Sequence, residues 1–395
     1  MLFAFDDARC RSLAEAHGTP CFAYSAAVAA EQFTTLRGVL PPRVRLAYAV
    51  KANPHPGLLA CFAALGASFD CASIGELARV EALDLAAGRT FFAGPGKREV
   101  ELRKALEMGV RVQAEGFEDL ARIDALATRE TAVNLRVHPA FDLDEGNRII
   151  GGTGPSAFGV DEEDVPVLLE KAAGLANVRI KGLHVFAASN QRDAAKLKAI
   201  HGAVLDLAKR LHEAHGLAFE QIDLGGGLGV PYASDEAPLD LATFGQGLSD
   251  LLARHAWFKG ELILEPGRFL AGPCGVYLAR VVRLKESRGT RFAILEGGIN
   301  HLIRPLLTGQ PFPVKAVGKG AEKGAEKGSG KAGGTVSYTL AGPLCTSLDR
   351  LGEVRLPELA AGDLLAFGTA GAYGLNEGMT HFLSHPVPPE VWVAG

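Results

Sequence analysis

The chain has 395 residues, of which 48% are apolar and 22% are charged. At about 150 residues per domain, this length suggests two or three domains, or one large α/β barrel with a partner domain. The apolar content excludes a largely disordered protein. Lys and Arg number 41 and Asp and Glu number 45, for a net charge of −4. This balance predicts no nucleic-acid or acidic-membrane partner.

The cysteines and the N-terminus predict a cytoplasmic protein. The six cysteines include no Cys-x-x-Cys pair, which favours reduced thiols over disulfides, and no metal site is predicted. The first residues, MLFAFDDARCR, carry charges before any apolar run and do not form a signal peptide. The most apolar stretch, residues 57–69, is too short to cross a bilayer as a helix, so no membrane segment is expected.

From residue 44 onward, short apolar runs alternate with amphipathic segments. The runs predict eight strands, at residues 44–50, 68–73, 90–95, 110–115, 132–137, 180–186, 219–224 and 262–265. The amphipathic segments predict helices at residues 75–85, 98–108, 117–126, 165–173, 192–215 and 239–255. Eight alternations over roughly 220 residues predict a (β/α)8 barrel. An open doubly wound sheet is the competing interpretation, but no GxGxxG follows the first strand.

The pattern changes after Glu265, where strands and turns predominate. Residues 276–284, 291–295, 336–340 and 364–366 read as strands of a second, mostly β domain. We therefore expect a barrel over 25–270 and a β domain built from 1–24 and 271–395, with the N-terminal segment pairing with C-terminal strands. Residues 318–334 contain a tandem GAEK repeat with seven glycines and four lysines, and are predicted to form a flexible surface loop.

Three motifs at the ends of predicted strands suggest the chemistry. Lys51 ends the first strand, where desolvation can activate an amine for Schiff-base formation. Gly225, Gly226 and Gly227 follow the seventh strand, and Glu265-Pro-Gly267-Arg268 follows the eighth. In barrels, the loops after these two strands often bind phosphate.

A reactive lysine combined with a phosphate site indicates pyridoxal 5′-phosphate. An acid such as Glu265 beside the pyridine nitrogen would keep the ring protonated and electron-withdrawing. This electronic state favours loss of a carboxylate from Cα.

Eight motifs taken together resemble the fold-type III pyridoxal-phosphate decarboxylases, the diaminopimelate and ornithine decarboxylase family. They are YAVKAN (48–53), FDCASIGEL (69–77), FFAGPGK (91–97), GLHVFAASN (182–190), DLGGGLG (223–229), EPGR (265–268), GPLCTSLDRL (342–351) and AGAYG (370–374). They occur in the family's order over about 325 residues. The resemblance implies a (β/α)8 barrel followed by a β domain, as in alanine racemase and ornithine decarboxylase. It also implies a homodimer with active sites at the interface.

The resemblance assigns roles position by position. Lys51 matches the Schiff-base lysine, and Cys345 matches a catalytic cysteine contributed across the dimer. The cofactor is expected to contact Lys51, His184, Phe186, Ser189, Gly225, Gly226, Gly227, Glu265, Gly267, Arg268 and Tyr373. Phe186 stands where relatives carry a histidine that stacks on the cofactor ring. Arg304, Thr346 and Asp349 are the expected substrate contacts.

Thr346 marks a departure that bears on the substrate. Diaminopimelate and ornithine decarboxylases typically carry an acid here, which holds the distal amine of the substrate. A buried ammonium without a counter-charge costs several kcal/mol. With Phe186, this departure resembles a subgroup in specialised biosynthesis that includes a decarboxylase of glutamyl groups on an acyl-carrier protein. The predicted substrate is an amino acid with a neutral or acylated distal end, including a carrier-bound one.

Several alternatives remain open from the sequence. Ordinary diaminopimelate decarboxylation to L-lysine is favoured by Arg304 and by overall motif similarity. An amino-acid racemase would share the barrel and Lys51, but the triglycine turn, Glu265 and GPLC argue against it. A non-catalytic pyridoxal-phosphate-binding regulatory paralogue is a third possibility, opposed by the presence of Lys51, Glu265 and Cys345.

Overall fold

The structure is a computed structural model that describes residues 2–86, 88–140, 154–186, 188–319 and 335–394. Within these ranges the chain forms two compact units. One unit comprises residues 30–230 and 238–270, and the other comprises 1–29, 231–237 and 271–395. The sequence placed residues 25–29 and 231–237 with the barrel, whereas here they belong to the second unit. Most of the predicted GAEK loop, residues 320–334, lies outside the described residues.

The first unit is a closed parallel barrel. Its sheet order is β5-β4-β3-β2-β10-β9-β8-β6, and pairing between β5 and β6 closes the cylinder. These strands match the eight predicted runs, and they are β2 (Val44–Ala49), β3 (Ser68–Cys71), β4 (Thr90–Phe92), β5 (Arg111–Ala114), β6 (Thr131–His138), β8 (Val178–His184), β9 (Gln221–Asp223) and β10 (Glu261–Leu264). The short β7 (Val160–Asp161) pairs only with β6. The predicted (β/α)8 barrel is confirmed.

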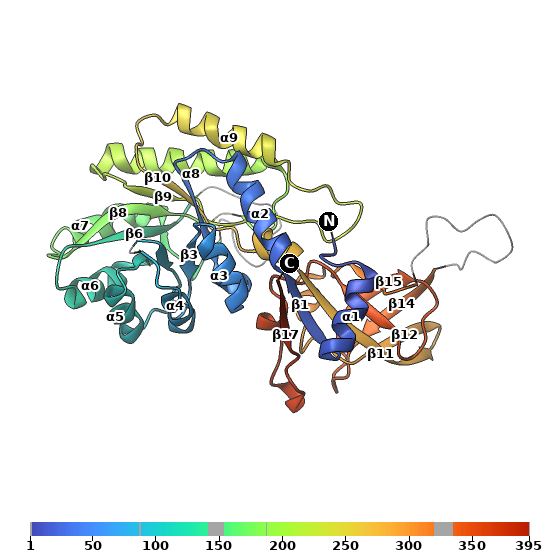
Figure 1. Cartoon of the computed structure of the whole chain (residues 1–395). Coiled ribbons are helices and arrows are strands. Elements are labelled where there is room, and N and C mark those ends of the chain that lie inside the picture. The colour runs from blue at the N-terminus through green and yellow to red at the C-terminus, as the bar shows by residue number, and fades with distance from the viewer. Residues whose placement is uncertain (1, 87, 141–153, 187, 320–334, 395) are drawn as a thin grey trace. The chain divides into compact units, whose positions relative to one another are not determined.

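Helices surround this barrel in Figure 1. The six predicted helices are present, as α4 (Ile74–Glu81), α5 (Glu99–Glu107), α6 (Phe117–Leu126), α7 (Val165–Ala172), α8 (Ala194–His215) and α9 (Leu241–Arg254). Three further helices were not predicted, namely α2 (Ala26–Val39), α3 (Pro56–Ala64) and the short α10 (Arg268–Ala271). The residues of α3, PGLLACFAA, are almost all apolar, so they lack the one-sided pattern that reveals a surface helix.

The second unit is built on a sheet in the order β13-β16-β11-β12-β14-β15, with β1 and β17 attached through β11. Its strands are β1 (Cys21–Ser25), β11 (Gly275–Ser287), β12 (Thr290–Leu295), β13 (Val314–Ala316), β14 (Val336–Ala341), β15 (Arg350–Leu356), β16 (Leu364–Phe367) and β17 (Glu390–Val393). As expected, the N-terminal segment pairs with C-terminal strands, because β1 lies antiparallel to β11 and parallel to β17.

A helix covers part of the second unit's sheet. Cys10 and Leu13 of α1 (Asp7–His17) pack with Cys21, Val276 and buried residues of β16 in one apolar cluster. The second short helix of this unit is α11 (Arg304–Thr308). All six cysteines are free thiols, and none of the helices in the described ranges is long and apolar enough to cross a bilayer.

Candidate active site

The barrel brings the polar side chains of distant motifs together at one end. Each lies at or just after the carboxyl end of a strand, which in barrel enzymes is the end that bears the active site. They are Lys51 after β2, Asp70 on β3, Gln113 on β5, Arg136 on β6, His184 on β8, Asp223 on β9 and Glu265 after β10. Asp70, Gln113, His184, Asp223 and Glu265 are buried.

Lys51 lies opposite a buried carboxylate. Its Nζ is 3.0 Å from Oδ2 of Asp70, whose side chain is almost inaccessible to solvent while that of Lys51 is 34% exposed. Burial and the negative charge of Glu265 raise the pKa of Asp70, and the ammonium of Lys51 opposes that rise. Asp70 therefore orients an amine that remains reachable from outside the barrel.

A second cluster joins His184, Asp223 and Glu265. Nε2 of His184 is 3.6 Å from Oε1 of Glu265, and one polar atom from each side chain lies within 4.8 Å of the others. Burial, reinforced by the charge of Glu265, raises the pKa of Asp223 well above its usual value. Burial alone would raise the pKa of Glu265 too, but His184 and Lys51 hold that pKa below its usual range. Glu265 is therefore the ionised member of the pair.

The triglycine turn follows β9 and packs against the segment after β8. Gly225 has φ +69°, and a Cβ there would lie 2.8 Å from the carbonyl oxygen of Val185. A Cβ on Gly227 would lie 2.6 Å from the carbonyl oxygen of Ala188. Only glycine permits this approach. The turn thus holds its backbone N–H groups next to the segment that carries Phe186 and Ser189.

Phe186 forms an aromatic wall beside Lys51. The centre of its ring is 5.6 Å from Nζ of Lys51, and the ring also abuts the positions that Cβ atoms would take at Gly225 and Gly226. The ring can stack and pack, but it cannot donate or accept a hydrogen bond. This is the consequence of phenylalanine at the place where the resemblance suggested histidine.

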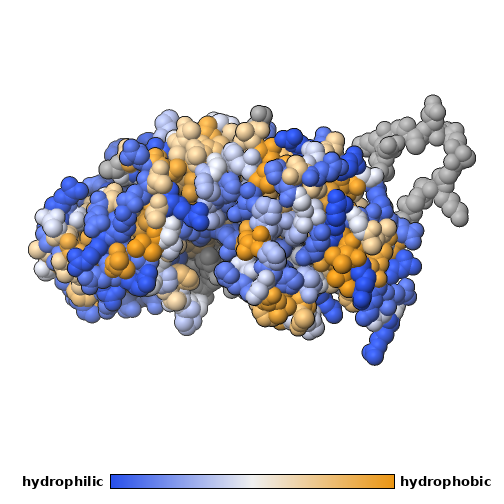
Figure 2. Space-filling view, turned by 60° about the horizontal axis from the view of Figure 1, so that its bottom comes forward, coloured by the Kyte–Doolittle hydropathy of each residue, from blue (hydrophilic) through white to orange (hydrophobic). Residues whose placement is uncertain are grey.

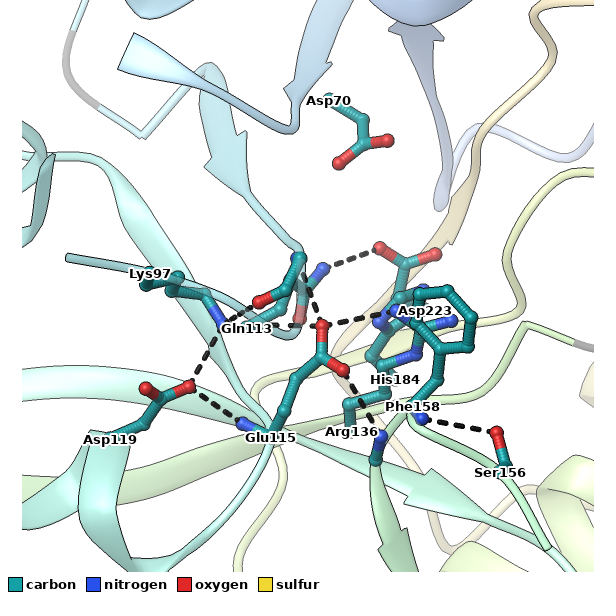
Figure 3. A network of polar contacts seen from close by, with 12 residues as sticks. Asp70, Lys97, Gln113, Glu115, Asp119, Arg136, Ser156, Phe158, His184 and Asp223 are labelled. Carbon is teal, nitrogen blue, oxygen red and sulfur yellow. Dashed lines mark hydrogen bonds and ion pairs between the residues drawn. The ribbon is translucent and has the colours of Figure 1, made fainter.

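Glu115 links three loops beside this cluster (Figure 3). Its Oε1 accepts from the N–H of Gly94 at 2.9 Å and from Nη1 of Arg136 at 3.1 Å, while Oε2 accepts from the N–H of Gly159. The buried Lys97 donates to Asp119 at 2.9 Å. In the same view Gln113 donates to Asp223 at 3.0 Å, which holds the central carboxyl group. This scaffold fixes the loops that follow β4, β5 and β6.

The barrel residues fit pyridoxal phosphate. Oε1 of Glu265 and both ring nitrogens of His184 are buried and have no hydrogen-bond partner among the described residues, as expected where a bound ligand supplies the missing donors and acceptors. Both oxygens of Asp223 already accept hydrogen bonds, from the N–H of Gly225 and from Gln113. His184, Asp223 and Glu265 are residue types that can bind a metal ion. Because both oxygens of Asp223 already accept hydrogen bonds, however, Asp223 is poorly placed to do so.

The second unit holds the remaining predicted residues. Asp349 is buried, and its two oxygens accept the N–H groups of Ile299 and Leu344, each at 2.8 Å. These bonds tie the loop that carries Cys345 and Thr346 to the segment that leads to Arg304. Burial raises the pKa of Asp349 despite these bonds. Asp349 organises the loop, an arrangement that argues against direct substrate contact.

The other second-unit residues differ in exposure. Cys345 is exposed, and Thr346 and Tyr373 are half-buried. Arg304 is buried, donates to Gln310 at 2.7 Å and lies over the ring of Tyr232, 4.7 Å from its centre. Tyr232 comes from the segment after the triglycine turn, and no sequence motif pointed to it.

Several barrel residues at the site were not predicted from the sequence. Asp70 and Asp223 lie inside quoted motifs, FDCAS and DLGGG, and an acid ending a predicted buried strand was the available signal. Gln113, Glu115 and Arg136 had no local signal, because only closure of the barrel brings them to the cluster.

A closed barrel with a lysine, a buried carboxylate and a glycine turn at its carboxyl end defines a barrel enzyme that uses an organic phosphate cofactor. Residues 27–272 match the model of the pyridoxal-binding domain of the pyridoxal-dependent decarboxylases. The chain belongs to this family, whose cofactor is pyridoxal phosphate.

Named relatives and solved structures extend over nearly the whole chain. The L-glutamyl-[BtrI acyl-carrier protein] decarboxylase of Niallia circulans is 31% identical over 98% of this chain and 91% of its own length. The diaminopimelate decarboxylase of Zymomonas mobilis is 33% identical over 97% and 89%. The crystal structure of diaminopimelate decarboxylase from Helicobacter pylori complexed with L-lysine superposes with a TM-score of 0.85 at 26% identity, covering 97% of this chain and 93% of that one.

Proposed function

We propose that this protein removes the α-carboxylate of an amino acid whose distal end is neutral or acylated, including one carried as a thioester on an acyl-carrier protein. The observation that carries this proposal is the loop of residues 344–349. Its only acid, Asp349, is buried and occupied by two backbone N–H groups. Thr346 offers a hydroxyl, so the loop supplies no carboxylate for a distal ammonium.

The barrel residues have separate tasks in this reaction. Pyridoxal phosphate, when bound, supplies the electron sink for the pair of electrons left on Cα when CO2 departs. Lys51 would hold the cofactor, oriented by Asp70. Glu265, ionised, would face the pyridine nitrogen and keep its proton in place. Gly225, Gly226, Gly227, Ser189, Gly267 and Arg268 would receive the phosphate, with Tyr373, and His184 would complete the polar side of the pocket.

Cys345 would return a proton to Cα after decarboxylation. An exposed thiol is suited to this role because it can reach a substrate that another element or subunit presents. Arg304 would bind a carboxylate of the substrate, and stacking on Tyr232 orients its guanidinium.

A homodimer is part of this proposal. The segments around α11, residues 344–349 and residues 378–387 are joined by hydrogen bonds through Ile299. They expose Leu306, Leu307, Leu348, Met379, Phe382, Leu383 and Val387. Figure 2 shows apolar side chains exposed among hydrophilic ones on one face of the molecule. Because Leu348 lies in the loop of Cys345 and the other segments are joined to that loop, a second copy that covers these residues would place this cysteine at the interface.

Diaminopimelate decarboxylation is the second candidate. Relatives with that name are 30–35% identical to this chain, as similar as the carrier-protein enzyme, and Arg304 suits a substrate with a second carboxylate.

The deciding experiment measures CO2 release from free meso-diaminopimelate, ornithine, lysine and L-glutamate, and from L-glutamate on the BtrI carrier, with added pyridoxal phosphate. We expect the carrier-bound or acylated substrate to be preferred. Faster release from free diaminopimelate would replace this proposal with the second candidate.

A further inference from the structure

One face of the second unit's sheet carries unbalanced positive charge. Between β11 and β12, Lys285 lies opposite Phe292 and Arg283 lies opposite Ile294. Between β12 and β14, Phe292 pairs with Thr339 and Ile294 pairs with Ala341. Ala341 in turn pairs with Arg350, and Ser337 pairs with Arg355. Partners in register share a face. We call these side chains, with Glu353 beside Thr339, the basic face.

The opposite face of the same strands is the domain core. Ala293 and Leu340 point there and are buried, while Leu284 beside Ala293 is exposed. The long side chains of the basic face are exposed, although Thr339 between them is buried. On the basic face Arg283, Lys285, Arg350 and Arg355 are exposed. Phe292 and Ile294 are half-buried between them, and the guanidinium of Arg350 lies 5.9 Å from the ring centre of Phe292. The face therefore has an apolar centre and a cationic rim, the composition of a protein interface.

The charge of this face is segregated within an acidic molecule. Four cations stand against the single acid Glu353, while the whole chain carries −4. Among the described residues Arg283, Lys285 and Arg350 have no ion pair, and Arg355 contacts the hydroxyl of Thr335. On the other face of the same hairpin Arg291 is paired with Glu286 at 3.7 Å. The cations of the basic face are thus available for a partner.

The basic face is continuous with the predicted substrate loop. Arg350 is the first residue of β15 and directly follows Asp349, which anchors the loop carrying Cys345 and Thr346. A partner seated at this end of the sheet would lie beside that loop. In Figure 1 β11, β12, β14 and β15 lie together in this unit.

We propose that the basic face docks the acyl-carrier protein that presents the substrate, which rests on the proposed function above. A cationic face selects an acidic protein surface and speeds encounter with it. The arm that holds an acyl group on a carrier is attached through a phosphodiester, and guanidinium groups such as Arg350 bind phosphate oxygens in pairs. The apolar centre at Phe292 and Ile294 would take an apolar part of the partner's surface.

The test uses the full chain loaded with pyridoxal phosphate, and the BtrI carrier protein bearing L-glutamate as the probe. Arg283→Gln/Lys285→Gln and Arg350→Gln are compared with the control Arg291→Gln/Lys209→Gln. Arg291 pairs with Glu286 on the other face of the same hairpin, and Lys209 pairs with Glu213 on α8. We expect the double variant to raise Kd for the carrier ~10-fold at low salt and to flatten its salt dependence. The control should bind as the unmodified chain does.

Turnover separates this inference from the proposed function. If docking is the role of the face, the variants raise KM for carrier-bound glutamate and leave release from free amino acids unchanged. Three results would overturn the inference. The unmodified chain fails to bind the carrier, the control variant loses as much affinity for the carrier as the basic-face variants, or polyglutamate at the same charge concentration displaces the carrier. Normal binding without CO2 release from the bound glutamate would refute the proposed function and leave the docking face standing.

Discussion

At the scale of single residues, the site divides charge between neighbouring carboxyl groups. Asp70, Asp223 and Glu265 are all buried, yet the pKa of Glu265 is lowered and those of the two aspartates are raised. The difference arises from His184 and Lys51, which lower the pKa of Glu265. One ionised carboxylate is thereby kept in this cluster, and the proposed function assigns it as the counter-charge of the pyridine nitrogen.

Replacing the carboxylate of Glu265 tests whether its negative charge is required. We expect Glu265→Gln to lower kcat by at least ~100-fold, because it removes the counter-charge while nearly preserving shape. Glu261→Gln, at the start of the strand that precedes Glu265 and in a half-buried pair with Arg45, is the control and should retain near-normal kcat. Equal rates for the two variants would show that the charge of Glu265 is dispensable.

Thr346 is the residue on which the proposed substrate depends. An acid introduced here would supply a counter-charge for a distal ammonium. We therefore expect Thr346→Glu to raise kcat/KM for diaminopimelate relative to acylated glutamate by ~10-fold or more. Ser347→Glu places the same charge one residue along the loop and should leave the ratio unchanged. A ratio unaffected by either change would argue against distal recognition by this loop.

At the scale of elements, the turn after β9 is constrained by two separate effects. Gly225 combines a positive φ with a close backbone neighbour. Gly216, the C-cap of α8, has φ +68°, but a Cβ added there would meet no heavy atom within 4 Å. Comparing Gly216 with Gly225 therefore separates the effect of backbone strain alone from that of strain combined with steric overlap.

We expect Gly216→Ala to lower the free energy of unfolding by about 1 kcal/mol through strain alone. Gly225→Ala should cost more and should also weaken cofactor binding, because the backbone must move away from Val185. Urea denaturation and the visible absorbance of the bound cofactor measure the two effects. Normal cofactor affinity in Gly225→Ala would show that the turn does not shape the phosphate site.

The contact between α8 and α9 contains a titratable group. His201 is buried on α8 against Phe244 of α9, and burial lowers its pKa to about 4. The folded state therefore favours neutral imidazole, while the unfolded chain takes up a proton near pH ~6.5. Stability is full above that pH, falls as pH drops from 6.5 towards 4, and levels off below the folded pKa.

The predicted loss from His201 is on the order of 3 kcal/mol over this range. His201→Gln should flatten the dependence of unfolding free energy on pH, measured by urea denaturation between pH 7 and pH 4. His17→Gln, at an exposed position, should leave the slope unchanged. An unaltered slope in His201→Gln would assign the acid sensitivity to other groups.

At the scale of the whole molecule, the candidate residues are divided between two units. The barrel carries Lys51 and Glu265, and the second unit carries Cys345 and Arg304. If the sites are shared across a homodimer, an inactive Lys51→Ala chain and an inactive Cys345→Ala chain should complement each other. Random pairing in a 1:1 mixture should restore about a quarter of the normal activity.

Activity assays after co-refolding, with sedimentation to measure the dimer, test this expectation. Each variant mixed with itself is the control and should stay inactive. A monomer at micromolar concentration, or no recovered activity in a mixed dimer, would contradict sharing of the sites.

The sequence determined the architecture of this protein and the identity of its main chemical groups. Strand and helix periodicity is local, so the eight barrel strands and six of its helices could be predicted from neighbouring residues alone. The lysine, the glycine turn and Glu265 were also found, because each belongs to a short motif. Apolar helix α3 was missed because its residues lack the one-sided pattern of a surface helix. Strand β15 was missed although Val354 and Leu356 alternate with the exposed Glu353 and Arg355.

Only the tertiary structure decided how these groups are paired. Asp70 faces Lys51 across 19 residues, Gln113 holds Asp223 across 110, and Asp349 turns inward to backbone N–H groups of Ile299 and Leu344. Such partners are set by closure of the barrel and by packing of the sheet, which join residues distant in the chain. Burial and these partners then determine which acid is charged, and this depends on the environment of a side chain as well as on its type.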